Sequence, residues 1–194
     1  MRIYLVTDER LLLGKDLYRT VEAAVKGGVS MVQLREKESS TREFVERAIR
    51  LKEVLTPYGV PLIINDRVDV ALAADADGVH VGQSDMLYEM VKRLLPEGKI
   101  IGLSVESPEQ VLEANNYDLD YVAASPVFST TTKTNTIVEW GLDGLRWIRS
   151  VSRHPLVAIG GIHSNNVASI FKAGADSVAV ISAIVSADDP ERAA

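Results

Sequence analysis

A dense group of hydrogen-bond donors lies in residues 125–133, whose sequence is Ser-Pro-Val-Phe-Ser-Thr-Thr-Thr-Lys. The last five of these residues carry four hydroxyl groups and one ammonium group, shortly after the apolar run 121–124. Hydroxyl and ammonium groups donate hydrogen bonds to anionic oxygens, so this loop is suited to binding a phosphate. An ordinary polar surface loop is the alternative, and the Ser/Thr run alone does not exclude it.

Three polar side chains at alternate positions lie at the end of another apolar run, residues 31–34. They are Gln33, Arg35 and Lys37, and the alternation of an extended chain would place them on one side. An arginine can bind a diphosphate in bidentate fashion, and a lysine adds a point charge. Together the three side chains could clamp a diphosphate; the alternative, which the motif alone would favour, is a solvated charged loop in which Glu36 is the local partner.

Two carboxylates follow the ends of neighbouring predicted strands. Asp66 comes directly after Asn65, and Asp85 follows the run that contains His80. Proteins usually hold Mg²⁺ with one or two carboxylates, while substrate oxygens and water complete the shell. Each aspartate also precedes a predicted helix, so helix N-capping is the alternative.

The remaining polar candidates also lie on strands or at strand ends. His80 is either a hydrogen-bonded core histidine or a ligand contact, and without His or Cys partners no zinc site is expected. Ser104 ends a strand and would direct its hydroxyl toward the same end of the sheet. Gly160-Gly161 and the run 180–182 follow two further strands, where backbone N–H groups commonly cradle a phosphate. A tight turn is the alternative for the glycine pair.

The elements that would position these residues alternate regularly along the chain. Apolar runs without polar alternation, typical of strands buried on both faces, lie at residues 3–6, 31–34, 61–64, 78–81, 100–104, 121–123, 156–159 and 177–180. Amphipathic helical patterns lie between them, at residues 17–26, 86–95, 108–114, 142–151 and 165–173. The clearest helix starts at the capping box of Ser40 and Glu43 and precedes Pro57.

Eight strand–helix units predict an α/β fold of the (β/α)₈ TIM barrel type, with residues 1–194 as a single domain. In such a barrel the loops that follow the strands form the active face, so the candidate residues would converge. An open doubly wound sheet is the alternative, although it normally has fewer strands. Residues 188–190 begin a helix just before the end of the sequence, so the eighth helix is expected to be truncated.

Composition excludes several classes of function. The 194 residues are 46% hydrophobic with a net charge of −6, and no long basic run indicates a nucleic-acid partner. No apolar run approaches the roughly 20 residues of a membrane span, and no signal peptide is evident. The chain has no cysteine, which favours a cytoplasmic location. Because the net charge is negative, the overall electrostatic field of the protein does not attract an anionic substrate, and local donors must hold it.

Taken together, these residues resemble the thiamine phosphate synthase family over essentially the whole chain, in order. The motifs that carry the resemblance are Tyr4-Leu5-Val6-Thr7-Asp8, Gln33-x-Arg35-x-Lys37, Asn65-Asp66-Arg67, Asp77-Gly78-Val79-His80-Val81-Gly82-Gln83-x-Asp85, Pro126-Val127-Phe128-x-Thr130-x-Thr132-Lys133, Gly160-Gly161-Ile162 and Val180-Ile181-Ser182. Each motif alone is weak, and the ordered series is specific.

The resemblance implies a reaction that joins 4-amino-2-methyl-5-hydroxymethylpyrimidine diphosphate to a thiazole phosphate, giving thiamine phosphate and pyrophosphate. Pyrophosphate would leave first, and the thiazole nitrogen would then attack the cationic pyrimidine methylene. The implied roles are Mg²⁺ binding by Asp66 and Asp85; diphosphate binding by Gln33, Arg35, Lys37, Asn65 and Lys133; and a hydrogen bond from Ser104 to the departing group. The resemblance also places Tyr4 and His80 near the pyrimidine. It places Thr130, Thr132, Gly161, Ile181 and Ser182 at the thiazole phosphate.

Arg35, Lys37, Ser104 and Lys133 would carry the catalysis, mainly by electrostatics and positioning. Ser129 replaces the proline common in the family, and residues 134–140 contain no Gly or Pro, so closure of this loop is an open point. The rival interpretations are a related thiazole tautomerase, a non-catalytic thiamine-phosphate-binding regulator and an unrelated phosphate-handling isomerase. The oligomeric state, and whether the thiazole is carboxylated, stay open.

Overall fold

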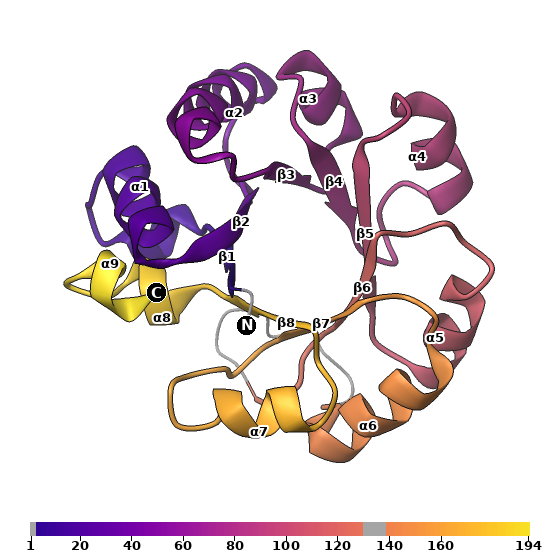
Figure 1. The fold of residues 1–194 in the computed structure, drawn as a ribbon. Helices are drawn as coiled ribbons and strands as arrows, with labels where there is room; N and C mark the ends of the chain where they lie inside the picture. Colours follow the sequence, from indigo (N-terminus) through magenta and orange to yellow (C-terminus); the bar gives the residue numbers. More distant parts are fainter. Residues whose placement is uncertain (1–2, 130–138) are drawn as a thin grey trace.

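The strands form one closed ring in this computed structural model, which describes residues 3–129 and 139–194. All eight strands are parallel, each pairs with the next in chain order, and β1 pairs with β8 (Figure 1). The prediction of a (β/α)₈ barrel is therefore confirmed, because an open doubly wound sheet would leave two unpaired edges.

The strands are β1 (Ile3–Val6), β2 (Val29–Leu34), β3 (Leu62–Asn65), β4 (Gly78–Val81), β5 (Ile100–Val105), β6 (Tyr121–Ala124), β7 (Leu156–Ile159) and β8 (Ser177–Val180). The helices are α1 (Leu17–Gly27), α2 (Thr41–Leu55), α3 (Val68–Ala73), α4 (Tyr88–Leu94), α5 (Pro108–Ala114), α6 (Gly141–Val151), α7 (Val167–Lys172), α8 (Ser182–Val185) and α9 (Pro190–Ala193). Two 3₁₀ helices, η1 (Glu9–Leu12) and η2 (Thr56–Tyr58), complete the described elements.

Two strands depart from their predicted bounds for identifiable reasons. β2 begins at Val29, two residues earlier than predicted, because the exposed Ser30 interrupts the apolar run without interrupting the strand. β3 begins at Leu62, one residue later, because Pro61 has no N–H to donate; its carbonyl still accepts a hydrogen bond from Val32. The capping box of α2 forms as predicted, with Ser40 and Glu43 each bonding the other's backbone N–H.

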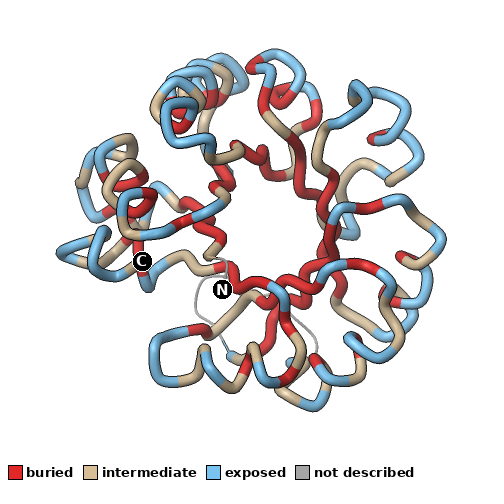
Figure 2. Tube along the Cα trace, viewed as in Figure 1, coloured by how far each residue is buried: buried red, intermediate tan, exposed pale blue. Residues whose placement is uncertain are grey.

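Buried residues follow the strands of the ring (Figure 2). Their side chains form two clusters, one on each face of the strands. The larger cluster fills the space between the strands and the outer helices, and includes Leu5, Val32 and Phe44. The smaller cluster belongs to the opposite face of the strands, inside the ring, and includes Tyr4 and Tyr121. Successive strand residues point to opposite faces, so each strand is buried on both faces, and this explains the uninterrupted apolar runs.

The chain ends in two short helices beside α1. Asp189 caps α9 by accepting a hydrogen bond from the Arg192 N–H at 3.1 Å, which agrees with the predicted helix start. α9 lies against α1 (Figure 1), so closely that a Cβ on Gly27 would sit 2.1 Å from the Glu191 carbonyl oxygen. The segment after β8 is thus built from α8 and α9, each of four residues, in place of one longer helix.

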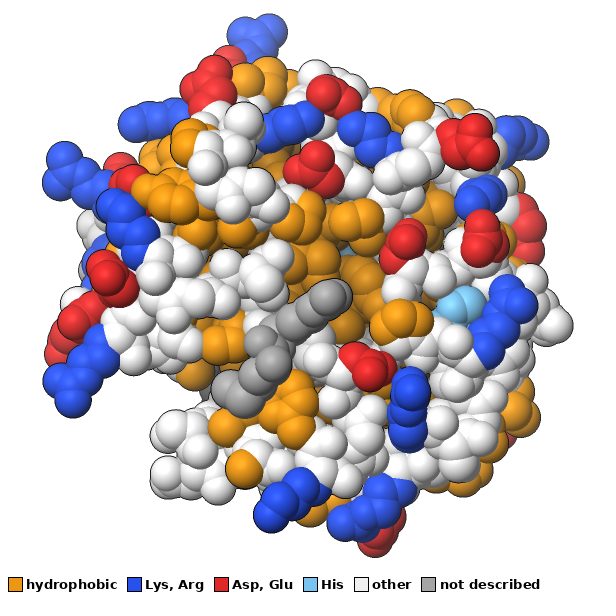
Figure 3. Space-filling view, viewed as in Figure 1, with side chains coloured by type: hydrophobic (Ala, Val, Ile, Leu, Met, Phe, Trp, Pro, Cys, Tyr) orange, Lys and Arg blue, Asp and Glu red, His pale blue; other side chains and the backbone are white. Residues whose placement is uncertain are grey.

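Acidic and basic side chains are interspersed on the face that Figure 3 displays, around a hydrophobic centre. Several pair between neighbouring segments; Asp75, for example, accepts from both Lys52 and Lys99. No helix within the described ranges is long and apolar enough to cross a membrane.

An aspartate recurs at the N-terminal ends of the strands, where its side chain bonds one strand to its neighbour. Asp77, Asp120 and Asp176 each precede an even-numbered strand. Their carboxylates accept the N–H of the residue that starts the preceding strand, or the next residue of it, at 2.7–2.8 Å. Each carboxylate satisfies a backbone N–H at the beginning of a strand. These contacts lie at the end of the barrel that holds the N-terminal ends of the strands.

We expect Asp77→Ala to lower the free energy of unfolding by about 1–3 kcal/mol, because the N–H of the fully buried Leu62 loses its acceptor. Urea denaturation measures this loss. The control is Asp118→Ala, which removes a carboxylate that is 83% exposed in its ion pair with Lys92, and should cost under about 1 kcal/mol. Equal losses in the two variants would contradict the prediction.

Candidate active site

A cavity of about 940 Å³ lies at the ends of the strands and is lined by residues from all eight strands or the segments that follow them. It brings together every predicted site residue that the structure describes: Tyr4, Gln33, Arg35, Lys37, Asn65, Asp66, His80, Asp85, Ser104, Gly161, Ile181 and Ser182. Thr130, Thr132 and Lys133 lie outside the described residues. The cavity therefore joins positions that are spread over most of the sequence.

The two predicted metal ligands face each other across the ends of β3 and β4. Burial raises the pKa of Asp85; a hydrogen bond from the Gly82 N–H at 2.7 Å opposes this shift, and the neighbouring Asp66 carboxylate adds to it. The Lys37 ammonium lies 2.5 Å from the Asp66 carboxylate. Two carboxylates and an ammonium thus form one compact charged group.

The N-cap alternative for these two aspartates is wrong. The N-caps of α3 and α4 are Arg67 and Leu87, and neither helix has a side-chain cap. Asp66 has φ of +63°, a left-handed conformation that costs free energy for a residue other than glycine. The fold holds it there through a 2.8 Å hydrogen bond from its N–H to the His80 carbonyl. Strain at this position is typical of a functional residue.

The donor set at this point fits Mg²⁺. Across the described ranges, no cluster of three or more His, Cys, Asp or Glu side chains could hold a metal by itself. A pair of facing carboxylates suits a cation that takes one or two protein carboxylates and completes its shell with substrate oxygens and water.

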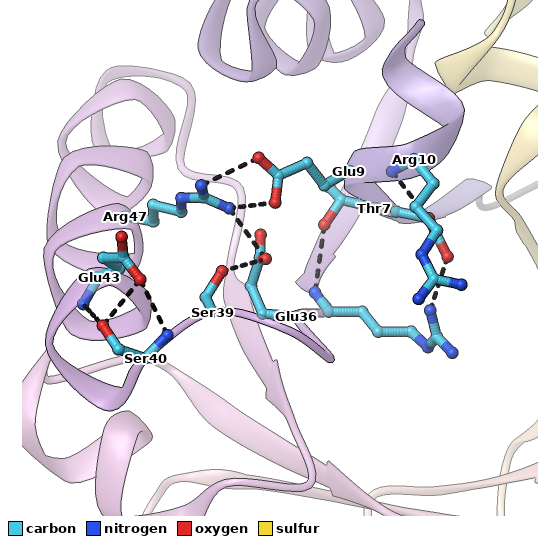
Figure 4. A network of polar contacts seen from close by, with 10 residues as sticks. Thr7, Glu9, Arg10, Glu36, Ser39, Ser40, Glu43 and Arg47 are labelled. Atoms are coloured by element: carbon cyan, nitrogen blue, oxygen red, sulfur yellow. Dashed lines mark hydrogen bonds and ion pairs between the residues drawn. The ribbon is translucent and has the colours of Figure 1, made fainter.

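Arg35 and Glu36 point in different directions and have different partners. Arg35 pairs with Asp8 of the segment after β1 at 2.7 Å, and its backbone N–H donates to the Thr7 hydroxyl at 3.1 Å. Glu36 instead accepts from Arg47 of α2 at 2.9 Å and from Ser39 at 2.8 Å (Figure 4). Glu36 is therefore not the partner of Arg35, as the solvated-loop alternative required.

Five buried polar side chains form a hydrogen-bonded chain across the floor of the cavity. The Gln33 amide donates to the Tyr4 hydroxyl at 2.7 Å, and this hydroxyl lies 2.9 Å from that of Tyr121. The Tyr121 hydroxyl lies 3.0 Å from His80 Nδ1, and His80 Nε2 lies 2.9 Å from the Ser104 hydroxyl. His80 is therefore both a hydrogen-bonded core histidine and part of the cavity wall.

These contacts can all be made with donation running from Gln33 toward Ser104. Burial raises the pKa of both Tyr4 and Tyr121, so each phenol keeps its single proton. In that arrangement the Tyr4 hydroxyl donates to Tyr121, and the Tyr121 hydroxyl donates to His80 Nδ1. It requires the neutral His80 tautomer that carries its proton on Nε2 and donates it to Ser104. The Ser104 hydroxyl is left to donate its own proton to a group in the cavity.

Tyr121 is the central member of this chain, and the sequence analysis did not single it out. A tyrosine at the start of an apolar run has the pattern of an ordinary core residue. The available signal was Gly102 on the neighbouring strand, which pairs with Tyr121. A Cβ on Gly102 would lie 2.1 Å from the Tyr121 ring, so glycine is needed there to make room for the phenol.

Gly160 and Gly161 form the opposite wall of the cavity. Both have positive φ, +103° and +65°, which favours glycine. They also lie against the segment after β6, since a Cβ on Gly160 would sit 2.7 Å from Pro126, and one on Gly161 2.8 Å from Phe128. Ile181 and Ser182 lie on the same wall. The tight-turn alternative thus holds for the backbone, and the turn presents its main chain to the cavity.

The two flanks of residues 130–138 are described. Ser129 is exposed and lines the cavity. On the other flank, Trp140 donates from its indole N–H to the Val105 carbonyl at 3.1 Å and from its backbone N–H to the Pro126 carbonyl at 3.0 Å. The question of loop closure, raised by Ser129 and residues 134–140, falls largely outside the described residues and stays open.

Comparisons with known proteins agree with the geometry. Residues 3–184 match the family model described as thiamine monophosphate synthase. The thiamine-phosphate synthase of Albidiferax ferrireducens is 52% identical over 190 residues, covering 98% of this chain and 87% of that protein. The thiamine-phosphate synthase of Vibrio campbellii is 50% identical, covering 99% of this chain and 94% of that protein.

A solved structure adds independent support. The thiamine phosphate pyrophosphorylase from Pyrococcus furiosus superposes with a TM-score of 0.90 and 41% identity, covering 99% of this chain and 91% of that chain. The likeness extends from the order of the motifs along the sequence to the whole barrel. This chain therefore belongs to the thiamine monophosphate synthase family.

Proposed function

We propose that this transferase joins 4-amino-2-methyl-5-hydroxymethylpyrimidine diphosphate to a thiazole phosphate, forming thiamine phosphate and releasing pyrophosphate. The observation that carries the proposal is the presence of two anion-binding regions in one cavity. Arg35, Lys37 and the aspartate pair follow β2 to β4, whereas Gly161 and Ser182 follow β7 and β8. In a closed barrel these strand groups lie on opposite sides of the mouth, as two separately anchored substrates require.

Departure of the diphosphate is the step that most needs help from the protein. Asp66 and Asp85 would hold Mg²⁺, which supplies positive charge to the leaving oxygens when it is bound. Arg35 and Lys37 add fixed positive charge at the same side of the cavity, and the Ser104 hydroxyl donates a hydrogen bond. The cation left on the pyrimidine would form in a cavity from which the bound substrates exclude water. A strong general base has no part in this scheme.

The rival functions make different demands on these residues. A tautomerase acting on the thiazole phosphate alone would need the glycine wall but neither the diphosphate nor the aspartate pair. A non-catalytic regulator would need binding without charge neutralisation at a leaving group. Of these three functions, only the synthase calls for the compact group of Asp66, Asp85 and Lys37.

The first test is the reaction itself. We expect the protein, with both substrates and Mg²⁺, to form thiamine phosphate and pyrophosphate in equal amounts, and EDTA to abolish both products. Chromatography of thiamine phosphate and a coupled pyrophosphate assay measure the two products. Isomerisation of the thiazole phosphate without coupling would favour the tautomerase, and binding of thiamine phosphate without turnover would favour the regulator.

A second test concerns the aspartate pair. We expect Asp66→Asn and Asp85→Asn each to lower kcat/KM by about a hundredfold or more, because each loses a charged metal ligand. Asparagine tolerates the left-handed conformation of residue 66, so the free energy of unfolding should change by less than about 1 kcal/mol. Steady-state kinetics at several Mg²⁺ concentrations and urea denaturation measure the two effects.

The control for this pair is Asp69→Asn, in an exposed ion pair with Arg67. Asp69→Asn should leave the kinetics unchanged. Unfolding of the Asp66 or Asp85 variant without a specific kinetic defect would argue against a metal-binding role.

A third test concerns the hydrogen-bonded chain. We expect Tyr121→Phe to lower kcat by about tenfold, because His80 Nδ1 loses its partner and Ser104 is less well oriented. If Tyr121 acts through Ser104, the double variant Tyr121→Phe/Ser104→Ala should be no slower than Ser104→Ala alone. Steady-state kinetics of the three variants measure the coupling.

Tyr117→Phe is the matched control, since Tyr117 bonds Glu113 at the surface. It should leave kcat unchanged. Additive effects of the Tyr121 and Ser104 variants would show that the two residues act independently.

A further inference from the structure

Arg47 lies on α2, behind the loop that carries Arg35 and Lys37. Its guanidinium donates to both carboxylate oxygens of Glu9, at 2.7 and 2.9 Å, and also to Glu36 at 2.9 Å (Figure 4). Glu9 belongs to η1, which follows β1, and Glu36 belongs to the loop that follows β2. One side chain on an outer helix thus bonds two neighbouring loops of the active face.

The two loops that Arg47 joins are those that hold the cationic side of the cavity. Glu9 is next to Asp8, the ion-pair partner of Arg35. Glu36 lies between Arg35 and Lys37 in the sequence, and both of these line the cavity while Glu36 faces α2. Any rotation of the backbone at residue 36 must therefore move the two neighbouring cationic side chains.

Burial makes the contact between Arg47 and Glu36 demanding. The Glu36 side chain is only 4% exposed, against 55% for Glu9. A carboxylate with so little access to water needs a cation, and removal of that cation leaves an uncompensated buried charge. The loop can relieve this cost by turning Glu36 toward water, and that movement turns Arg35 and Lys37 out of the cavity.

From this arrangement we infer that Arg47 is a positioning residue for the diphosphate: by holding Glu36 and Glu9, it fixes the direction in which Arg35 and Lys37 face the cavity. The inference rests on the proposed function for the identity of the ligand. It makes a specific distinction between the two substrates, because among the described residues no hydrogen bond or ion pair joins Arg47, Glu9 or Glu36 to the glycine wall after β7 and β8.

Arg47→Met retains the apolar stem and removes the guanidinium. We expect it to lower kcat/KM for the pyrimidine diphosphate by about ten- to a hundredfold through misplacement of the two cations. KM for the thiazole phosphate should stay at the wild-type value. Arg47→Lys keeps the charge but cannot bond Glu9 in bidentate fashion while reaching Glu36, so we expect an intermediate loss.

The matched control is Arg149→Met. Arg149 also pairs with a carboxylate of another segment, Asp176, but at the start of β8 and away from the cavity mouth. It should change neither KM, and because this pair is about half exposed we expect it to lose less stability than Arg47→Met. A double variant, Arg47→Met/Glu36→Gln, removes the buried charge together with its partner. We expect it to recover part of the affinity lost in Arg47→Met, because a neutral side chain at position 36 can stay buried without a cation.

Calorimetric binding of inorganic pyrophosphate with Mg²⁺ provides a readout that does not depend on turnover. We expect weaker binding to Arg47→Met than to the wild type and to Arg149→Met. Equal pyrophosphate affinity in all three proteins, or equal increases in KM for both substrates, would overturn the positioning role. Failure of the wild type to couple the substrates would instead refute the proposed function. If Arg47→Met does not fold, the comparison of Arg47→Lys with the wild type decides the matter.

Discussion

Closure of the strands through the pairing of β1 with β8 is the constraint on which the rest of the structure depends. Closure brings eight strand ends to one mouth, so residues as distant in sequence as Tyr4 and Ser182 line the same cavity. It also separates the mouth into two sides, one formed after β2 to β4 and the other after β7 and β8. Arg35, Lys37 and the aspartate pair belong to the first side, and the glycine wall belongs to the second. Two anionic substrates could therefore be held apart while their reacting atoms meet between them.

The same closure creates a demand inside the ring, where polar side chains are cut off from water. Tyr4, Gln33 and Tyr121 are each at most 4% exposed. Buried polar atoms without partners cost free energy, and every such side-chain atom in the described residues has a partner. The hydrogen-bonded chain meets this demand and, with His80 protonated on Nε2, leaves the Ser104 hydroxyl to donate into the cavity. A requirement of stability and a feature of the site are thus met by one set of contacts.

Much of this arrangement could be predicted from sequence, for reasons that differ between elements. The strands are buried on both faces, so their apolar runs show in the sequence, and the Ser40 capping box is a local signal that tertiary contacts do not alter. The exposed Ser30 and the six-residue helix α3 escape such patterns, because one breaks the apolar run and the other is too short to show a period. The candidate residues converged because their motifs mark strand ends.

What sequence could not provide was the direction in which side chains point. Glu36 is adjacent to two cations in sequence, yet it bonds Arg47, eleven residues further along the chain. Tyr121 looks like a core residue until its contacts with Tyr4 and His80 are known. In both cases the decisive partner comes from another element. Local patterns carry no information on such contacts.

The charges at the cavity mouth give a physical reason for a metal and a diphosphate to bind together. Among the described residues, the cavity is lined by two cations, Arg35 and Lys37, and by the carboxylates of Asp66, Asp85 and Glu106. Each cation already has a carboxylate partner, Asp8 for Arg35 and Asp66 for Lys37. A diphosphate alone would meet a site with a net negative charge and would have to displace Asp66 from Lys37. A divalent cation held by Asp66 and Asp85 would offset that charge and free the ammonium for the diphosphate, so each would make the binding of the other more favourable.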